Sequence, residues 1–247
     1  MGILGLFQKR GATPDNIAKQ VTKAKDPYSQ SEYRVDAMKR LLQWNTKESL
    51  LGVLDRFSAV VQSPHWDEEE KTWLKEELQQ KGNLAKEAIV QFIATAAAVT
   101  HPAQILASLC SNQQEFATLL QQALQARPPE DHRGSQAKRE LILALQAIDT
   151  EGIVATICPY LHDQNDDVRC AAIDAVRARG NKKIRLQLVD MLTDTGNSPR
   201  VLRHAAAAAS RLNLPVGDAF VLPPSLQGSY IVQDSKLKHR SAQPTSD

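Results

Sequence analysis

Aromatic residues and cysteines are both scarce in this chain of 247 residues. Phe, Trp and Tyr make up 5% of it, and Leu, Ala, Ile and Val supply most of the apolar content in helix-favouring runs. Because strands are enriched in aromatic and β-branched residues, this composition favours an almost entirely α-helical protein. The cysteines, Cys110, Cys158 and Cys170, are odd in number and widely spaced, which argues against a disulfide framework. We expect them to be reduced core thiols of a cytoplasmic protein.

Long hydrophobic runs are also missing. No window approaches the ~20 apolar residues of a membrane span, since even residues 89–100 are followed by His101 and Pro102. The opening MGILGLFQKRG has its basic residues after the apolar run, which is the wrong order for a secretory signal. Leu6 stands where N-myristoylation requires Ser or Thr. We therefore expect a cytoplasmic location, with MGILGLF as a docking or packing segment.

Recognisable catalytic and metal-binding motifs are absent from the sequence. Glycine-rich phosphate loops, nucleophile elbows and His-rich zinc motifs do not occur, and the six histidines are dispersed. Cys158 and His162 are four residues apart and could form a metal pair, but Pro159 lies between them and no third ligand is evident. Glu68–Glu70 with Glu76–Glu77 could hold a hard cation, although a solvated helix face explains them better. We expect no cofactor, no metal and no catalytic residue.

Helix-ending residues recur at short intervals along the chain. The apolar spacing predicts a helix over 13–25 and a second one that begins at Ser29 or Ser31 and ends at Asn45. Further helices are predicted over 67–80, 136–147, 150–162, 166–179, 182–193 and 199–213. Apolar stripes of helical spacing lie over 50–61, 85–93, 101–109 and 116–124. Residues 127–135 form the longest internal connection, interpreted as a mobile insertion loop more than as a domain boundary. The connections are otherwise short, which favours antiparallel neighbouring helices.

One pattern of apolar residues repeats along these helices. Counted from Arg169, apolar positions fall at plus three, plus seven and near plus nineteen, and Arg34 and Lys71 begin similar series. The pattern predicts about five helical hairpins with a period of roughly 30 to 40 residues, inside the range of helical solenoids. Such hairpins bury their apolar faces by stacking on one another.

The stretch LHDQNDDVRCAAIDAVRARGN, residues 161–181, resembles the second half of a HEAT repeat. Over most of its length the chain is similar to bacterial HEAT-repeat proteins of unassigned function. The resemblance implies an all-α fold, an α-solenoid of HEAT-like, armadillo-type hairpins. It also implies that Asp167 and Arg169, which match the turn Asp and the helix Arg of such repeats, make structural contacts between adjacent hairpins.

The predicted organisation has four parts. Residues 1–28 form an N-terminal segment and cap helix, and residues 29–214 form the solenoid. Residues 215–240 lack a helical period, but 228–232 alternate like a strand, 233–236 are turn-like and 237–240 could return as a second strand. This predicts a small β-hairpin appendage that packs on the last helices, followed by a disordered tail over 241–247.

A non-catalytic scaffold or adaptor that binds protein partners is the function we predict from this architecture. Its polar contacts would come from Arg177, Arg200 and Arg203 on the inner helices. Trp66 is either an exposed anchor for a partner or a residue of local packing.

Two alternative functions follow from the same sequence. Nine Lys and Arg residues between Arg169 and Arg211 could bind nucleic acid, although no aromatic residue in this stretch could stack on a base and the net charge of the chain is only +2. By resemblance, an enzyme of the HEAT-like glycosylase or lyase type would need an acidic and an aromatic residue facing a cleft, and the residues to locate are Trp66, Asp67 and the six histidines.

Overall fold

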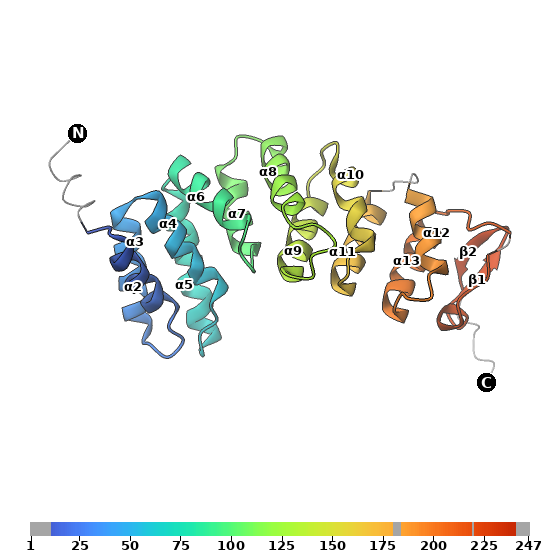
Figure 1. Cartoon of the computed structure of the whole chain (residues 1–247), viewed down its shortest axis with the longest axis horizontal. Helices are drawn as coiled ribbons and strands as arrows, with labels where there is room; N and C mark the ends of the chain where they lie inside the picture. The colour runs from blue at the N-terminus through green and yellow to red at the C-terminus, as the bar shows by residue number, and fades with distance from the viewer. Residues whose placement is uncertain (1–10, 180–183, 219, 241–247) are drawn as a thin grey trace. The chain divides into compact units, whose positions relative to one another are not determined.

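The computed structural model describes residues 11–179, 184–218 and 220–240, and over these residues the chain is mostly helical with one small antiparallel sheet (Figure 1). The predicted helical class and the predicted C-terminal hairpin are therefore confirmed. The MGILGLF segment and the tail over 241–247 lie outside the described residues. None of the described helices combines the length and the apolar composition that crossing a bilayer requires.

The elements follow one another with short connections. The helices are α2 Pro14–Lys25, α3 Ser31–Trp44, α4 Lys47–Leu54, α5 Pro64–Gln79, α6 Asn83–Ile93, α7 Thr100–Leu109, α8 Gln113–Gln125, α9 Ser135–Gln146, α10 Ile153–Ile157, α11 Asp166–Ala178, α12 Arg185–Thr193 and α13 Pro199–Arg211. Short 3-10 helices are η1 Asp55–Ser58, η2 Cys158–His162 and η4 Pro224–Leu226, and the strands are β1 Tyr230–Gln233 and β2 Lys236–His239.

The chain divides into two compact units, Met1–Ala126 and Arg127–Asp247, which we call unit 1 and unit 2. The division falls at the connection over 127–135 that the sequence predicts to be a mobile insertion loop. Hydrogen bonds hold this connection within unit 2: the Lys138 ammonium donates to the carbonyls of Pro128 and Asp131, and the Tyr160 hydroxyl donates to the carbonyl of Arg127. These contacts come from α9 and η2, both of which follow the loop in the sequence, and the Pro-Gly composition of the loop does not predict them.

In unit 1 the helices pack in two layers. In one layer α3 packs on α5 and α5 on α7, and in the other α2 packs on α4, α4 on α6 and α6 on α8. Apolar side chains spaced three and four residues apart fill the space between the layers, among them Leu41, Leu50, Leu74 and Ile89, all fully buried. Each hairpin alone would leave these faces in water, so the stack supplies the stability of its helices.

Unit 1 also buries a cluster of charged side chains. The Arg34 guanidinium donates to Glu70 from Nε at 3.0 and 3.1 Å and from Nη2 at 2.6 Å, and Arg56 donates to Glu70 at 2.9 Å and to Asp67 at 2.7 Å. Lys71 donates to the second oxygen of Asp67 at 2.7 Å. Because buried charges are costly unless paired and hydrogen-bonded, this cluster joins α3, η1 and α5 specifically.

In unit 2 the first helices of successive hairpins again pack in series. Helix α9 packs on α11 and α11 on α13, while α10 and η2 lie against α11, and α12 lies against α13. Helix α13 contributes buried alanines, among them Ala205, Ala206 and Ala209, and such small side chains allow neighbouring helices to approach closely.

The C-terminal hairpin packs on the last helix. Strands β1 and β2 pair antiparallel with Tyr230 opposite His239, and Asp234 and Ser235 form the turn with positive φ angles of 54° and 56°. Both central residues being left-handed is the geometry of the tight turns that suit twisted hairpins. Leu237 is buried, and β2 lies against α13.

Candidate functional site

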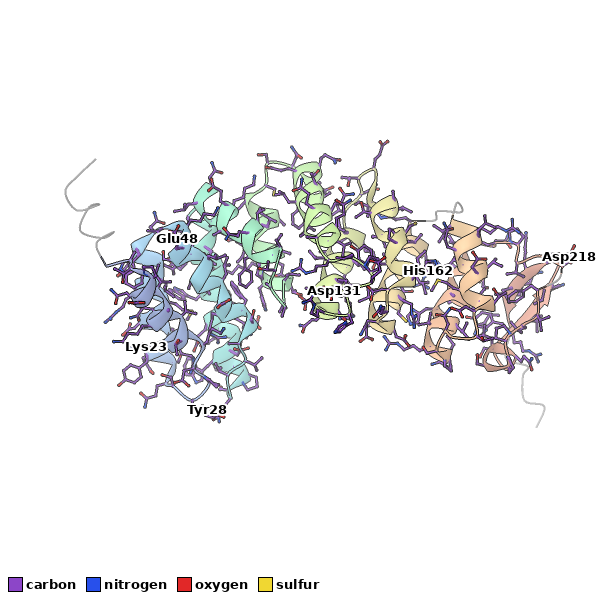
Figure 2. All side chains as sticks on the ribbon, viewed as in Figure 1. Lys23, Tyr28, Glu48, Asp131, His162 and Asp218 are labelled. Atoms are coloured by element: carbon purple, nitrogen blue, oxygen red, sulfur yellow. The ribbon has the colours of Figure 1, made fainter. Side chains whose placement is uncertain are left out.

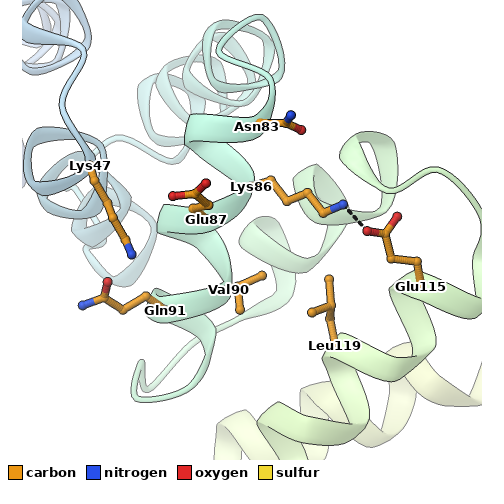
Figure 3. A pocket seen from close by; sticks show the side chains of 8 residues that line it. All are labelled: Lys47, Asn83, Lys86, Glu87, Val90, Gln91, Glu115 and Leu119. Carbon is orange, nitrogen blue, oxygen red and sulfur yellow. Dashed lines mark hydrogen bonds and ion pairs between the residues drawn. The ribbon is translucent and has the colours of Figure 1, made fainter.

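A groove of about 700 Å³ lies on the layer of unit 1 formed by α4, α6 and α8. The side chains that line it are a mixture of polar, charged and apolar ones (Figure 3). They are Lys47, Asn83, Lys86, Glu87, Val90, Gln91, Glu115 and Leu119.

Helical spacing places these side chains together. The five residues from α6 stand at positions i, i+3, i+4, i+7 and i+8 and so share one face of the helix, whereas Ala85, Ala88 and Ile89 on the other face are buried in the core. Glu115 and Leu119 are one helical turn apart on α8. The same pattern that buries one side of α6 therefore presents the opposite side to the groove.

An ion pair between Lys86 and Glu115 connects α6 to α8 within the groove (Figure 3). The hydrogen bond to Glu115 raises the pKa of Lys86. The hydrogen bond from Lys86, with a second one from the Ser111 backbone, lowers the pKa of Glu115. Both groups are thus held in their charged forms at neutral pH, where neither is suited to proton transfer.

The remaining lining is suited to a polypeptide. Figure 3 shows Val90 and Leu119 extending into the space between α6 and α8, where they offer apolar contact. Asn83 and Gln91 carry amides that can both donate to and accept from a peptide backbone. Two cations and two anions line the groove, so its formal charge is zero, which is unfavourable for a polyanion.

Sequence reasoning did not find this groove. The sequence feature that corresponds to the groove is the helical spacing of polar residues along α6, but a helix face that is simply exposed to solvent has the same spacing. Only the packing of α6 against α4 and α8 distinguishes the two cases.

Asp167 and Arg169, the two residues expected to make contacts between adjacent hairpins, have different partners. Asp167 forms an ion pair with Arg200 of α13, while Arg169 pairs with Asp166 one turn away in α11. The carboxylate of Asp166 also accepts a hydrogen bond from Ser198, the N-cap of α13. The acidic turn thus joins α11 to α13, and it does so through Arg200, which the sequence assigns to partner binding.

The other two predicted contact arginines also lie on these helices. Arg177 pairs with Asp174 at 3.1 Å, and the same carboxylate lies 3.0 Å from the His204 ring. Arg203 is exposed and forms no ion pair within the described part of the chain. All three arginines lie on α11 and α13, the first helices of their hairpins, whereas the groove of unit 1 lies mainly on second helices.

The candidate residues for enzyme chemistry have structural surroundings. Asp67 is bound to Arg56 and Lys71. Burial raises the pKa of the Cys158 thiol, which keeps it protonated at neutral pH. Among the described residues no three His, Cys, Asp or Glu side chains are grouped as metal ligands would be. Trp66 stands in the first turn of α5 and is 48% exposed.

Comparison of the chain with protein-family models, curated proteins and solved structures finds no match. Its function therefore has to be inferred from its own residues.

Proposed function

We propose that this protein is a non-catalytic protein-binding module that holds an extended segment of a partner in the groove of α4, α6 and α8. We further propose that the helical hairpins form a HEAT-like solenoid. The serial packing of α3, α5 and α7, and of α4, α6 and α8, supports this within unit 1, and α9, α11 and α13 support it within unit 2.

The observation that carries the proposal is the mixed lining of the groove. Backbone carbonyls and N–H groups of an extended segment would bind the amides of Asn83 and Gln91, while its side chains would contact Val90 and Leu119. The Lys86–Glu115 ion pair fixes the positions of two of the walls before binding, which lowers the entropic cost of association.

A site-specific cross-link tests the proposal in the full chain. A photoreactive amino acid at Lys47, which lines the groove, should cross-link a discrete protein segment in cells, and a synthetic peptide of that segment should bind the purified protein. The double substitution Asn83→Ala/Gln91→Ala should weaken binding of that peptide about tenfold, as loss of central contacts does. Gln114→Ala on α8, which lies outside the groove, is the matched control and should bind as the wild type does.

Two results would overturn the proposal. One is a cross-linked peptide whose affinity is the same for the double variant and the wild type. The other is retention of DNA or RNA that collapses between low and moderate salt, which would favour the nucleic-acid alternative. Since the groove is formally neutral, we expect peptide affinity to change little over the same salt range.

A further inference from the structure

A second pocket in unit 1, of about 300 Å³, lies between the turn before α3 and the N-terminus of α5. Its outer lining includes Pro27, Tyr28, Gln30, Glu32, Gln62 and Trp66. We call it the aromatic pocket. It shares no lining residue with the groove of α4, α6 and α8.

Two aromatic rings of this pocket are exposed on well-defined backbone. Tyr28 is 82% exposed and stands at the turn between α2 and α3 (Figure 2), where its N–H donates to the Asp26 carboxylate at 3.0 Å. Trp66 is held in the first turn of α5, after Pro64 at the start of that helix. Trp and Tyr in such positions are the residues that most often dominate binding energy at interfaces.

Glu32 determines the charge of the pocket. The other charged lining residue, Arg34, is buried, and its guanidinium is occupied by Glu70 and by the carbonyls of Asp26 and Ser29. The Glu32 carboxylate is exposed and forms no ion pair with any described residue. The accessible charge is therefore negative, so a cationic partner complements it.

The lining of the aromatic pocket also carries free hydrogen-bond donors. The side-chain amides of Gln30 and Gln62 are exposed, and no described residue accepts from the Trp66 indole N–H. A polyproline II segment makes no internal hydrogen bonds, so its carbonyls are available to such donors. It is also ordered before binding, which matters in a shallow pocket with little area to offset the loss of conformational entropy.

We infer that the aromatic pocket binds a proline-rich segment with an arginine or lysine beside its prolines. The prolines stack on Tyr28 and Trp66, the carbonyls accept from the indole and amide donors, and the cation lies near Glu32. Aromatic grooves that recognise polyproline II helices use the same physical chemistry. With the groove, this pocket gives the chain two separate docking sites, as a scaffold requires.

Fluorescence polarisation with the labelled peptide RPLPPLP and the full chain tests the inference. We expect saturable binding at micromolar to submillimolar concentration. The peptides RALAALA and EPLPPLP should each bind about tenfold or more weakly, because one loses the proline rings and the other places a carboxylate beside Glu32.

Substitutions locate the site. Tyr28→Ala and Trp66→Ala should each weaken RPLPPLP about tenfold or more, and Glu32→Gln should reduce the preference for RPLPPLP over EPLPPLP. Tyr33→Ala is the matched control, since Tyr33 is 62% exposed on the same helix as Glu32 but does not line the pocket. Circular dichroism checks that each variant is folded, and Tyr28 and Glu32 are exposed enough to be replaced without loss of the core.

Three outcomes would overturn the inference. The first is no binding of RPLPPLP up to about 1 mM, where the binding free energy is already weak. The second is equal binding of RALAALA, which would show that the prolines are not recognised, and the third is equal binding to the Tyr28 and Trp66 variants, which would place the peptide elsewhere. Lys86→Ala in the groove should bind RPLPPLP as the wild type does. The inference can therefore fail while the proposed function stands, and the reverse.

Discussion

At the scale of single residues, one buried ion pair in unit 2 has nearly all of its hydrogen-bonding groups satisfied. Lys138 and Asp163 have side chains with 0% exposure and lie 2.6 Å apart. The Lys138 ammonium uses its other two donors on the carbonyls of Pro128 and Asp131, and Asp163 also accepts from the backbone N–H of Asn165. A pair of this kind adds little stability over an apolar pair, but removal of one partner leaves an unpaired charge in the core.

Lys138→Ala should therefore lower the free energy of unfolding by about 3–5 kcal/mol. Urea unfolding at neutral pH measures it. Arg139→Ala, at the exposed neighbouring position, should change stability by no more than about 0.5 kcal/mol. The apolar double variant Lys138→Met/Asp163→Leu should recover much of the loss, and a single variant as stable as the wild type would contradict the role given to the pair.

Glu70 should make the free energy of unfolding fall at acidic pH. Burial alone would raise its pKa, but hydrogen bonds from Arg34, Ser31 and Arg56 outweigh burial and lower the pKa below its ordinary value of 4.5. Since the pKa is lower in the folded state, this stabilisation is complete above pH 4.5 and is lost as the pH falls through the folded-state value.

Urea titrations from pH 7 to pH 3 check this prediction. Glu70→Gln should be less stable than the wild type at pH 7, and its stability should fall less steeply below pH 4.5, because it has no carboxylate to protonate there. The exposed Glu68→Gln should keep the wild-type slope. Identical slopes for the wild type and Glu70→Gln would exclude Glu70 as a source of the acid sensitivity.

At the scale of elements, N-caps determine where several helices begin. The Asn165 side chain accepts from the backbone N–H groups of Asp167 and Val168 at the start of α11. Asn165→Ala should cost about 1 kcal/mol of unfolding free energy. The exposed neighbour Gln164 provides the control, since Gln164→Ala removes no cap, and thermal denaturation of the two variants should separate them.

The elements that the sequence predicts best are a helix with both an N-cap and an apolar period and a hairpin with alternating residues. Helix α11 was predicted over 166–179 and spans Asp166–Ala178, and the C-terminal hairpin follows the predicted alternation. The single helix predicted over 150–162 was wrong: it divides into α10, Ile153–Ile157, and the 3-10 helix η2, because Pro159 has no N–H for a helical hydrogen bond. Helix α5 begins earlier than predicted because Pro64 occupies its first turn.

The candidate sites were harder to predict for a physical reason. The sequence identifies Trp66 as a candidate because Trp is enriched among interface hot spots, but nothing local distinguishes Tyr28. The groove depends on which helix lies beside α6, and the Lys138–Asp163 pair joins residues 25 positions apart. Single-sequence periodicity contains no such information, because it reports which face is apolar and not what covers it.

At the scale of the molecule, the chain divides into two compact units. A substitution that destabilises only unit 2 should leave unit 1 folded. In Lys138→Ala, hydrogen exchange should accelerate over the described residues from 127 onward, while amides in α3 to α8 keep their wild-type protection. Acceleration to the same extent in both units would show that they unfold as one cooperative body.

The C-terminal hairpin also bears on self-association. The free edge of a sheet is a template on which another chain can add a strand. Here each strand has only four residues, the bridge between Pro215 and Lys236 occupies part of the β2 edge, and Pro215 has no N–H with which to extend the ladder. Lys236 adds a positive charge beside this edge, whereas Lys238 is paired with Asp234 within the hairpin. The strand that packs on α13 thus has an outer edge that is a poor template for strand addition by a second copy of the chain.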